Sequence, residues 1–203
     1  IYQCDWSSDV CSSDLVQESA DRLGRLDACF ANAGVSGRTG KHTSFAEMTT
    51  EEWRRVMSVN LDGVFFTVRA AVRIMLKQGQ GGSIVVTGSQ FGRMGNPLVE
   101  HYAAAKAGVE SLMRSMATEF GRDGIRCNTI VPGYIDTPLT HARINAPEFI
   151  ADAMHRHAIG RWGVPEDFAG IAVFLASDSS RWTTGQSFVI DGGFNVAAKI
   201  KGA

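Results

Sequence analysis

The sequence predicts an α/β protein in which helices cover both faces of a doubly wound parallel sheet. Short apolar runs of strand length alternate along the chain with longer segments of helical periodicity. The runs are apolar throughout, which is typical of strands buried on both faces. Each run ends in glycine, proline or small polar residues, which indicates a loop at its carboxyl end. The four runs are residues 26–31, 83–89, 125–131 and 187–190.

Composition places the chain among ordinary single-domain proteins. It has 203 residues, 44% hydrophobic and 20% charged, with a formal net charge of -1. This balance gives no electrostatic reason to expect nucleic acid or an anionic membrane surface as a partner. No apolar run reaches the roughly 18 residues needed to cross a bilayer. Cys29 and Cys127 fall inside apolar runs and are expected to be core residues, so a reducing cytoplasm fits.

The first fifteen residues differ from the rest. They hold two Ser-Ser-Asp repeats and two of the four cysteines, without a basic region or a helical period. Their sequence resembles the translation of a sequencing-library adapter. We therefore expect residues 1–15 to be a non-native segment and residues 16–203 to be the C-terminal part of a single domain. A natural polar tail is the alternative.

Helices are predicted between the strands. Residues 16–23 form the last turns of an amphipathic helix, and Gly24 ends it. Thr49 and Glu52 form a capping box for a segment that continues to about Gln78. Further helices are predicted for residues 101–120 and 165–176. Residues 139–159 are expected to form a mobile substrate lid that carries solvated histidines, and no set of residues completes a metal site.

Tyr102 and Lys106 are the first candidates for chemistry. In a helix they lie four residues apart on one face, so the ammonium is expected to lower the pKa of the phenol, which is normally about 10. Such a tyrosine can exchange a proton with an alcohol or a carbonyl. Ser89 ends the strand of residues 83–89, where open α/β sheets keep their ligands. A solvated lysine beside a half-buried tyrosine is the alternative.

These residues resemble the short-subunit branch of the short-chain dehydrogenase/reductase family. Ser89 lies 13 residues before Tyr102, and Pro132 lies 30 residues after it. Asn32-Ala33-Gly34 and the end of the chain from Arg161 also fit the family. The resemblance implies a Rossmann-like sheet of seven strands, of which the first three are lacking here. On the order of 65 residues would then be absent, including the Gly-rich loop that binds the cofactor pyrophosphate.

The resemblance also implies roles for individual residues. Tyr102 would be the acid/base, Lys106 would tune it and hold the nicotinamide ribose, and Ser89 would orient the substrate oxygen. Asn60 would carry a proton relay at a helix kink; the alternative is a solvent-facing Asn at a bend. NAD or NADP is the implied cofactor, and the implied cofactor-binding residues are Asn32, Ala33, Gly34, Tyr102, Lys106, Pro132, Gly133, Ile135 and Thr137.

The expected function is that of an NAD(P)-dependent oxidoreductase that interconverts a secondary alcohol and a ketone. The three-residue gap between Tyr102 and Lys106 resembles ketoreductases and not enoyl reductases. A non-catalytic scaffold of the same fold is the alternative. Small residues at 103–105, 107 and 108 favour a helix-to-helix contact in a dimer or tetramer. The 203-residue chain is expected to bind cofactor poorly and to leave the strand at residues 27–32 as a sheet edge. The specific substrate, the choice between NAD and NADP, and the reaction direction stay open.

Overall fold

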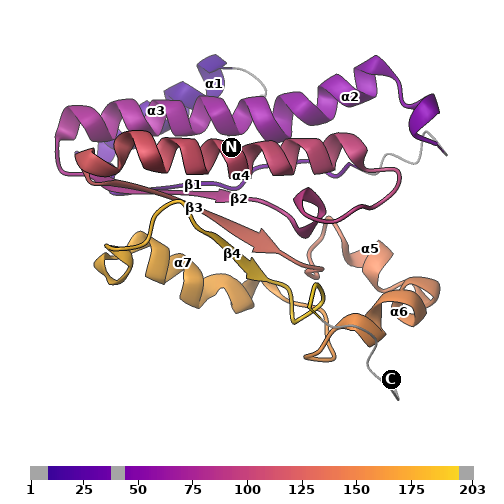
Figure 1. The fold of residues 1–203 in the computed structure, drawn as a ribbon. Coiled ribbons are helices and arrows are strands. Elements are labelled where there is room, and N and C mark those ends of the chain that lie inside the picture. The colour runs from indigo at the N-terminus through magenta and orange to yellow at the C-terminus, as the bar shows by residue number, and fades with distance from the viewer. Residues whose placement is uncertain (1–8, 38–43, 197–203) are drawn as a thin grey trace.

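A computed structural model describes residues 9–37 and 44–196 of the chain (Figure 1). The α-helices are α1 (Asp9–Leu23), α2 (Thr50–Met57), α3 (Gly63–Gln78), α4 (Glu100–Phe120), α5 (His141–Ile144), α6 (Pro147–Ala153) and α7 (Ala169–Ala176). The strands are β1 (Ala28–Ala31), β2 (Gly82–Thr87), β3 (Ile125–Pro132) and β4 (Ser187–Ile190). The predicted alternation of strands and helices is confirmed.

The described strands form one parallel sheet in the order β1-β2-β3-β4. Ser83 of β2 pairs with Ala28 on one side and Arg126 on the other, and Thr129 of β3 pairs with Ser187. Because all strands run the same way, their carboxyl ends meet at one edge of the sheet. Within the described residues β1 is an outer strand, as the sequence predicted. Its Phe30 side chain is exposed.

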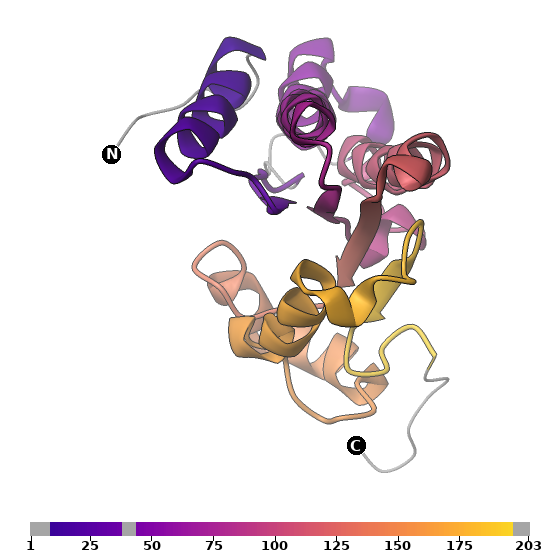
Figure 2. The ribbon, with the colours of Figure 1, turned by 90° about the vertical axis from the view of Figure 1, so that its left-hand side faces the viewer.

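Helices cover both faces of this sheet. Figures 1 and 2 show α1, α3 and α4 side by side on one face and α7 on the other. The larger core lies under the first layer and includes Ile84, Val109 and Met113. Cys29 and Cys127 belong to it as free, buried thiols, as predicted. A smaller core under α7 joins Val85, Ile130 and Leu175. The doubly wound architecture is therefore present.

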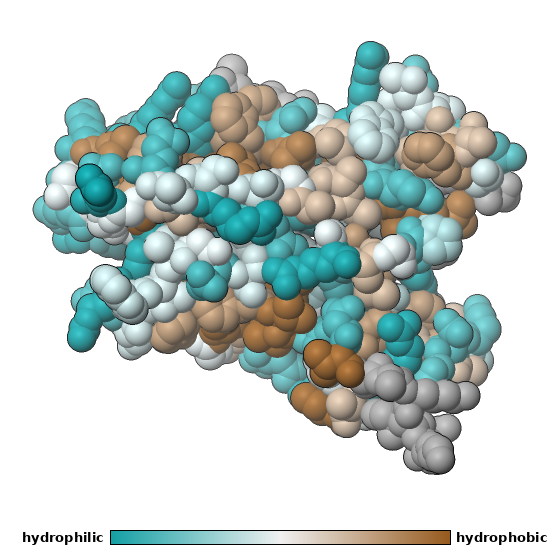
Figure 3. All heavy atoms as spheres, viewed as in Figure 1, coloured by the Kyte–Doolittle hydropathy of each residue, from teal (hydrophilic) through white to brown (hydrophobic). Residues whose placement is uncertain are grey.

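Both layers have a mixed surface. In Figure 3 hydrophilic and hydrophobic residues are interspersed over the upper helical layer, and hydrophobic residues also reach the surface over the lower layer of α7 and β4. Val173 and Val189 are among the exposed apolar residues of that layer. In the part of the chain that the structure describes, no helix combines the length and apolar character needed to cross a membrane.

The first helix begins earlier than predicted. Only residues from Val16 were assigned to it, but α1 starts at Asp9. Val16 and Ala20 of the predicted apolar face are buried, whereas Leu23, the third apolar residue of that face, is exposed. The helix continues into the segment of residues 1–15, and the origin of that segment stays a prediction.

The segment after β3 folds into two short helices, α5 and α6, which pack on a third apolar cluster with Trp162 and Phe194. His157 is part of this region and is only 2% exposed, so its predicted solvation is wrong. Its imidazole lies edge-on to Trp162, with 4.6 Å between the ring centroids. The expectation failed because the C-terminal segment packs over this histidine, which local helical spacing does not show.

Candidate active site

The candidate residues gather where the strands end. Thr87 is the last residue of β2, and its hydroxyl donates to the side-chain carbonyl of Asn32 over 2.7 Å. Asn32 follows β1 directly, so this bond fixes the carboxyl ends of the two neighbouring strands together. The predicted strand of residues 83–89 ends at Thr87, which leaves Ser89 just beyond the sheet. This edge is where parallel α/β sheets bind ligands.

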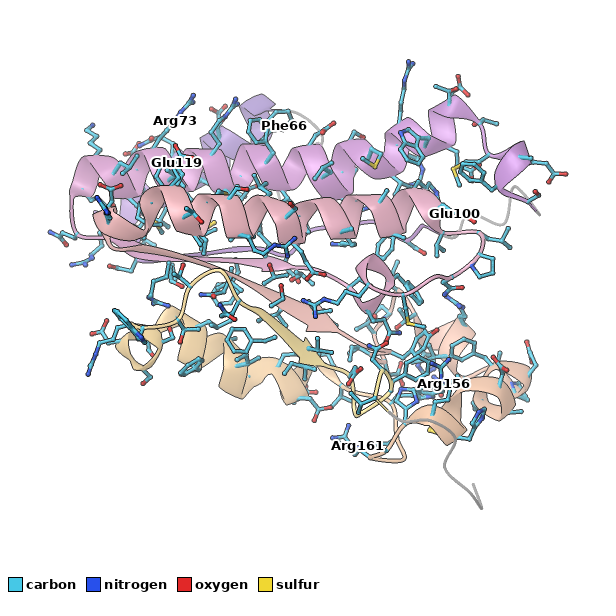
Figure 4. All side chains as sticks on the ribbon, viewed as in Figure 1. Phe66, Arg73, Glu100, Glu119, Arg156 and Arg161 are labelled. Atoms are coloured by element: carbon cyan, nitrogen blue, oxygen red, sulfur yellow. The ribbon has the colours of Figure 1, made fainter. Side chains whose placement is uncertain are left out.

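Tyr102 and Lys106 both lie in the first half of α4. Figure 4 marks the start of this helix by Glu100, close to the turn that follows β2. Lys106 is only 3% exposed, its Nζ donates to the Thr87 carbonyl over 2.8 Å, and it lies 5.7 Å from the centre of the Tyr102 ring. The predicted shared face is confirmed. A solvated lysine is excluded.

Burial dominates the acid–base behaviour of both groups. Burial raises the pKa of the Tyr102 phenol, and a side-chain hydrogen bond with Ser89 opposes that rise. Burial lowers the pKa of Lys106 to about 8. The expected lowering of the Tyr102 pKa by Lys106 is therefore wrong for this structure. The ammonium points to the Thr87 carbonyl, and the desolvation of the phenolate outweighs what its neighbours supply.

Ser89 sits at the start of a tight 3-10 turn, Gln90–Gly92. It is buried, and its Oγ accepts a hydrogen bond from the Phe91 backbone N–H over 3.2 Å. With that lone pair engaged, the hydroxyl hydrogen is free to point toward Tyr102 or a bound oxygen. Ser89 and Tyr102 are thus brought together from a loop and a helix, as the sequence predicted.

Asn60 occupies an irregular turn between α2 and α3. Thr49 caps α2 by accepting from the Glu52 N–H, as predicted, but residues Ser58–Asp62 form a π-helix. Asn60 is fully buried, so the solvent-facing alternative is wrong. Its side chain donates to the carbonyls of Val35 and Val56 and accepts from the Val35 N–H. π-Turns often occur at functional sites.

Two glycines let the loop after β1 approach these residues. A Cβ on Gly34 would lie 2.7 Å from Asn60 Oδ1 and 3.8 Å from Lys106 Nζ. A Cβ on Gly37 would lie 2.5 Å from the Cβ of Tyr102. The Asn32-Ala33-Gly34 triplet therefore belongs to the same constellation as Asn60 and Lys106.

The loop after β3 reaches the site through aromatic rings. Gly133 donates from its N–H to Ile190, and Ile135 bridges to Gly163. Tyr134 lies edge-on to Phe91, which in turn lies edge-on to Tyr102.

The side chain of Thr137, the last of the predicted cofactor residues, bonds to the hydroxyl of Thr140. Pro132 ends β3, and Gly133, Ile135 and Thr137 follow it in one loop. The structure does not show these four residues in contact with Tyr102. Figure 4 shows Arg156 and Arg161 on the segments that follow this loop.

Sequence reasoning missed several contributors. The Thr87 carbonyl that binds Lys106 carries no side-chain signal. The Phe91 N–H that bonds to Ser89 is likewise a backbone group without a side-chain signal. The ion pair between Arg93 and Glu110 was not anticipated, because 17 residues separate the partners. Within residues 9–37 and 44–196, no three His, Cys, Asp or Glu side chains are grouped as metal ligands.

Fold and site together define a Rossmann-like α/β protein in which Ser89, Tyr102 and Lys106 gather at the carboxyl edge of a parallel sheet. The profile of the family described as Enoyl-(Acyl carrier protein) reductase matches residues 1–195. The chain belongs to the short-chain dehydrogenase/reductase family of oxidoreductases.

Named relatives span several substrates. The chain is 40% identical over 182 residues to L-rhamnose-1-dehydrogenase of Scheffersomyces stipitis, covering 90% of this chain and 69% of that protein. It is 37% identical to the NADP-dependent (R)-specific alcohol dehydrogenase of Lentilactobacillus kefiri, covering 95% and 75%. The crystal structure of a gluconate 5-dehydrogenase from Burkholderia cenocepacia J2315 with NADP and tartrate is similar, with a TM-score of 0.88 and 31% identity, covering 96% and 74%.

Proposed function

We propose that this chain belongs to an NAD(P)-dependent oxidoreductase that interconverts a secondary alcohol and a ketone. The observation that carries the proposal is the meeting of Ser89, Tyr102 and Lys106 at the carboxyl edge of the sheet. The relatives also include cyclohexanol dehydrogenase of Acinetobacter sp. and (3R)-3-hydroxyacyl-CoA dehydrogenase of Mus musculus, whose names describe secondary alcohols as substrates.

The residues present fit the nucleoside and ribose parts of a nicotinamide dinucleotide. A cavity of about 270 Å³ opens at the end of β1 and is lined by Asn32 and Ala33 together with Val59, Val64 and Thr67. Two of the residues that the family resemblance assigns to the cofactor thus line an open, mostly apolar space of the kind that accepts a nucleoside. Lys106 retains N–H donors beyond the one given to Thr87, and these are suited to ribose hydroxyls.

A bound nicotinamide supplies or accepts the hydride; the protein supplies position and protons. For ketone reduction the Tyr102 phenol donates its proton to the carbonyl oxygen, and Ser89 donates a hydrogen bond to the same atom. Because burial raises the pKa of the Tyr102 phenol, this group stays protonated and can act as an acid. For alcohol oxidation the Tyr102 phenolate takes the proton from the substrate hydroxyl. Asn60 is proposed to hold the relay between Lys106 and solvent.

The substrate surface beside the reacting atoms is proposed to be aromatic. Phe91 lies edge-on to Tyr102, and Tyr134 lies edge-on to Phe91. The family profile is described by an enoyl reductase, whereas the spacing of Tyr102 and Lys106 favours a carbonyl substrate. One assay should therefore compare enoyl thioesters, ketones and cyclic alcohols as substrates. The chain is also proposed to act as a dimer or tetramer.

The proposal is tested by following reduced nicotinamide, which is consumed when ketones or enoyl thioesters are supplied with NADH or NADPH and is formed when alcohols are supplied with NAD⁺ or NADP⁺. Because the 203-residue chain is expected to bind cofactor poorly, the assay uses a chain extended at its amino terminus by the corresponding segment of one of these relatives. In that protein Tyr102→Phe should remove turnover, because the phenyl ring fills the same space without a transferable proton. Turnover that survives in Tyr102→Phe would refute the assignment. An extended protein that binds neither cofactor and converts none of the substrates would favour the scaffold alternative.

A further inference from the structure

A side-chain ion pair connects the turn that carries Ser89 to helix α4. The Arg93 Nε lies 2.9 and 3.2 Å from the two carboxylate oxygens of Glu110, and one Arg93 Nη also bonds to that carboxylate. The Glu110 side chain is 5% exposed, and the Arg93 side chain is 40% exposed. The carboxylate is thus buried in a fork-shaped contact with a guanidinium that approaches from the surface.

Each partner of the ion pair lies close in sequence to residues proposed to be catalytic. Glu110 is one helical turn after Lys106 and two turns after Tyr102, so all three share one face of α4. Arg93 ends the 3-10 turn that Ser89 begins, and its N–H donates to the Gln90 carbonyl over 2.9 Å. The ion pair therefore joins the segment of Ser89 to the helix of Tyr102.

The turn also lies directly on the helix backbone. A Cβ on Gly92 would stand 2.9 Å from the carbonyl carbon of Lys106 and from the amide nitrogen of Ala107. Phe91 of the same turn also packs edge-on against Tyr102 of α4. The fork formed by Arg93 and Glu110 adds a directional side-chain contact between the turn and α4.

A buried ion pair is a poor source of stability, because the desolvation of its charges offsets much of their attraction. Apolar side chains of similar volume can often replace such a pair without loss of stability. The fork fixes the orientation of the Arg93 side chain relative to Glu110, which an apolar pair would not do.

We propose that Arg93 and Glu110 are positioning residues that keep the Ser89 hydroxyl within hydrogen-bond reach of Tyr102. The inference rests on the roles proposed for Ser89 and Tyr102, but its test needs no turnover. Arg93→Met combined with Glu110→Met removes the fork without leaving a buried unpaired charge. A matched control combines Arg25→Met with Asp27→Asn, which removes an exposed fork-shaped pair just before β1.

Hydrogen exchange of the Phe91 amide is the first measurement, since this N–H bonds to Ser89. In the Arg93/Glu110 variant exchange should accelerate on the order of ten-fold in residues 90–94 and remain unchanged in β2, whereas a general loss of stability would accelerate both. The second measurement is the ultraviolet titration of phenolate, taken as the difference from Tyr102→Phe. Loss of the Ser89 bond should move the Tyr102 titration to higher pH.

The control pair should change neither measurement. If the double variant does not fold, Arg93→Lys, which keeps the charge but not the fork, is measured in its place with the same expectations. Unchanged Phe91 exchange together with an unchanged Tyr102 titration would overturn the proposal, whether or not the protein proves to be an oxidoreductase.

Discussion

Replacing Lys106 by methionine should weaken the dependence of the free energy of unfolding on pH between about pH 7 and about pH 9.5. Burial lowers the pKa of Lys106 from 10.5 to about 8. The folded state therefore resists protonation of this group, so its contribution to stability is present above about pH 10.5 and is lost as the pH falls to about 8. A shift of this size corresponds to about 3 kcal/mol between the two limits. Between about pH 7 and about pH 9.5 the change amounts to about 2 kcal/mol.

Urea unfolding of the wild type and of Lys106→Met at these two pH values measures the effect. As the pH rises, the free energy of unfolding of the wild type should increase by about 2 kcal/mol more than that of the variant, because every other titrating group is common to both proteins. Lys77→Met, which removes an exposed lysine from α3, controls for the loss of one positive charge. An identical gain in wild type and Lys106→Met would show that Lys106 is not desolvated as the structure indicates.

Three further outcomes are expected. Gly34→Ala should lower stability by about 1–3 kcal/mol, because the new Cβ would stand 2.7 Å from Asn60 Oδ1; thermal unfolding measures this, and an unchanged melting temperature would contradict the close approach. The hydrogen bond from Arg161 lowers the pKa of Asp167 to about 2. The contribution of this ion pair to folding stability is therefore present above about pH 4 and is lost as the pH falls toward about 2. Asp167→Asn should accordingly have a flatter acid-unfolding profile, and a profile that matches the wild type would argue against the ion pair. Burial lowers the pKa of His157, so stability should fall as the pH drops below about 6.5; His157→Phe, which suits the aromatic surroundings, should lose less stability between neutral and mildly acidic pH, and an equal loss would count against burial as the cause.

The sheet and the main site residues could be predicted because each has a local signature. Helical period alone places Tyr102 and Lys106 on one face of α4, and the end of an apolar run places Ser89 at the carboxyl edge of the sheet. The strand at residues 28–31 follows from its uninterrupted apolar run. In each case the deciding pattern lies within a few residues of sequence.

The features that escaped prediction depend on contacts between distant segments. Nothing local marks the Thr87 carbonyl as the partner of Lys106, or Arg93 as the partner of Glu110. The burial of His157 depends on the C-terminal segment, whose Phe194 ring packs against it. The direction of the Tyr102 pKa shift was missed for a related reason: the pattern shows which charges are near, but not how much water the fold removes.

The π-turn at residues 58–62 has a consequence for the gene as well as for the protein. The π-turn contains one residue more than an α-helical turn between the same neighbours. A single-codon deletion in this segment would therefore yield a regular, unstrained α-helix. That helix would rotate Asn60 by roughly a quarter turn away from the Val35 backbone. Length in this segment is thus constrained by geometry even where residue identity is not, and drift by insertion or deletion should be far rarer here than in the surface loops.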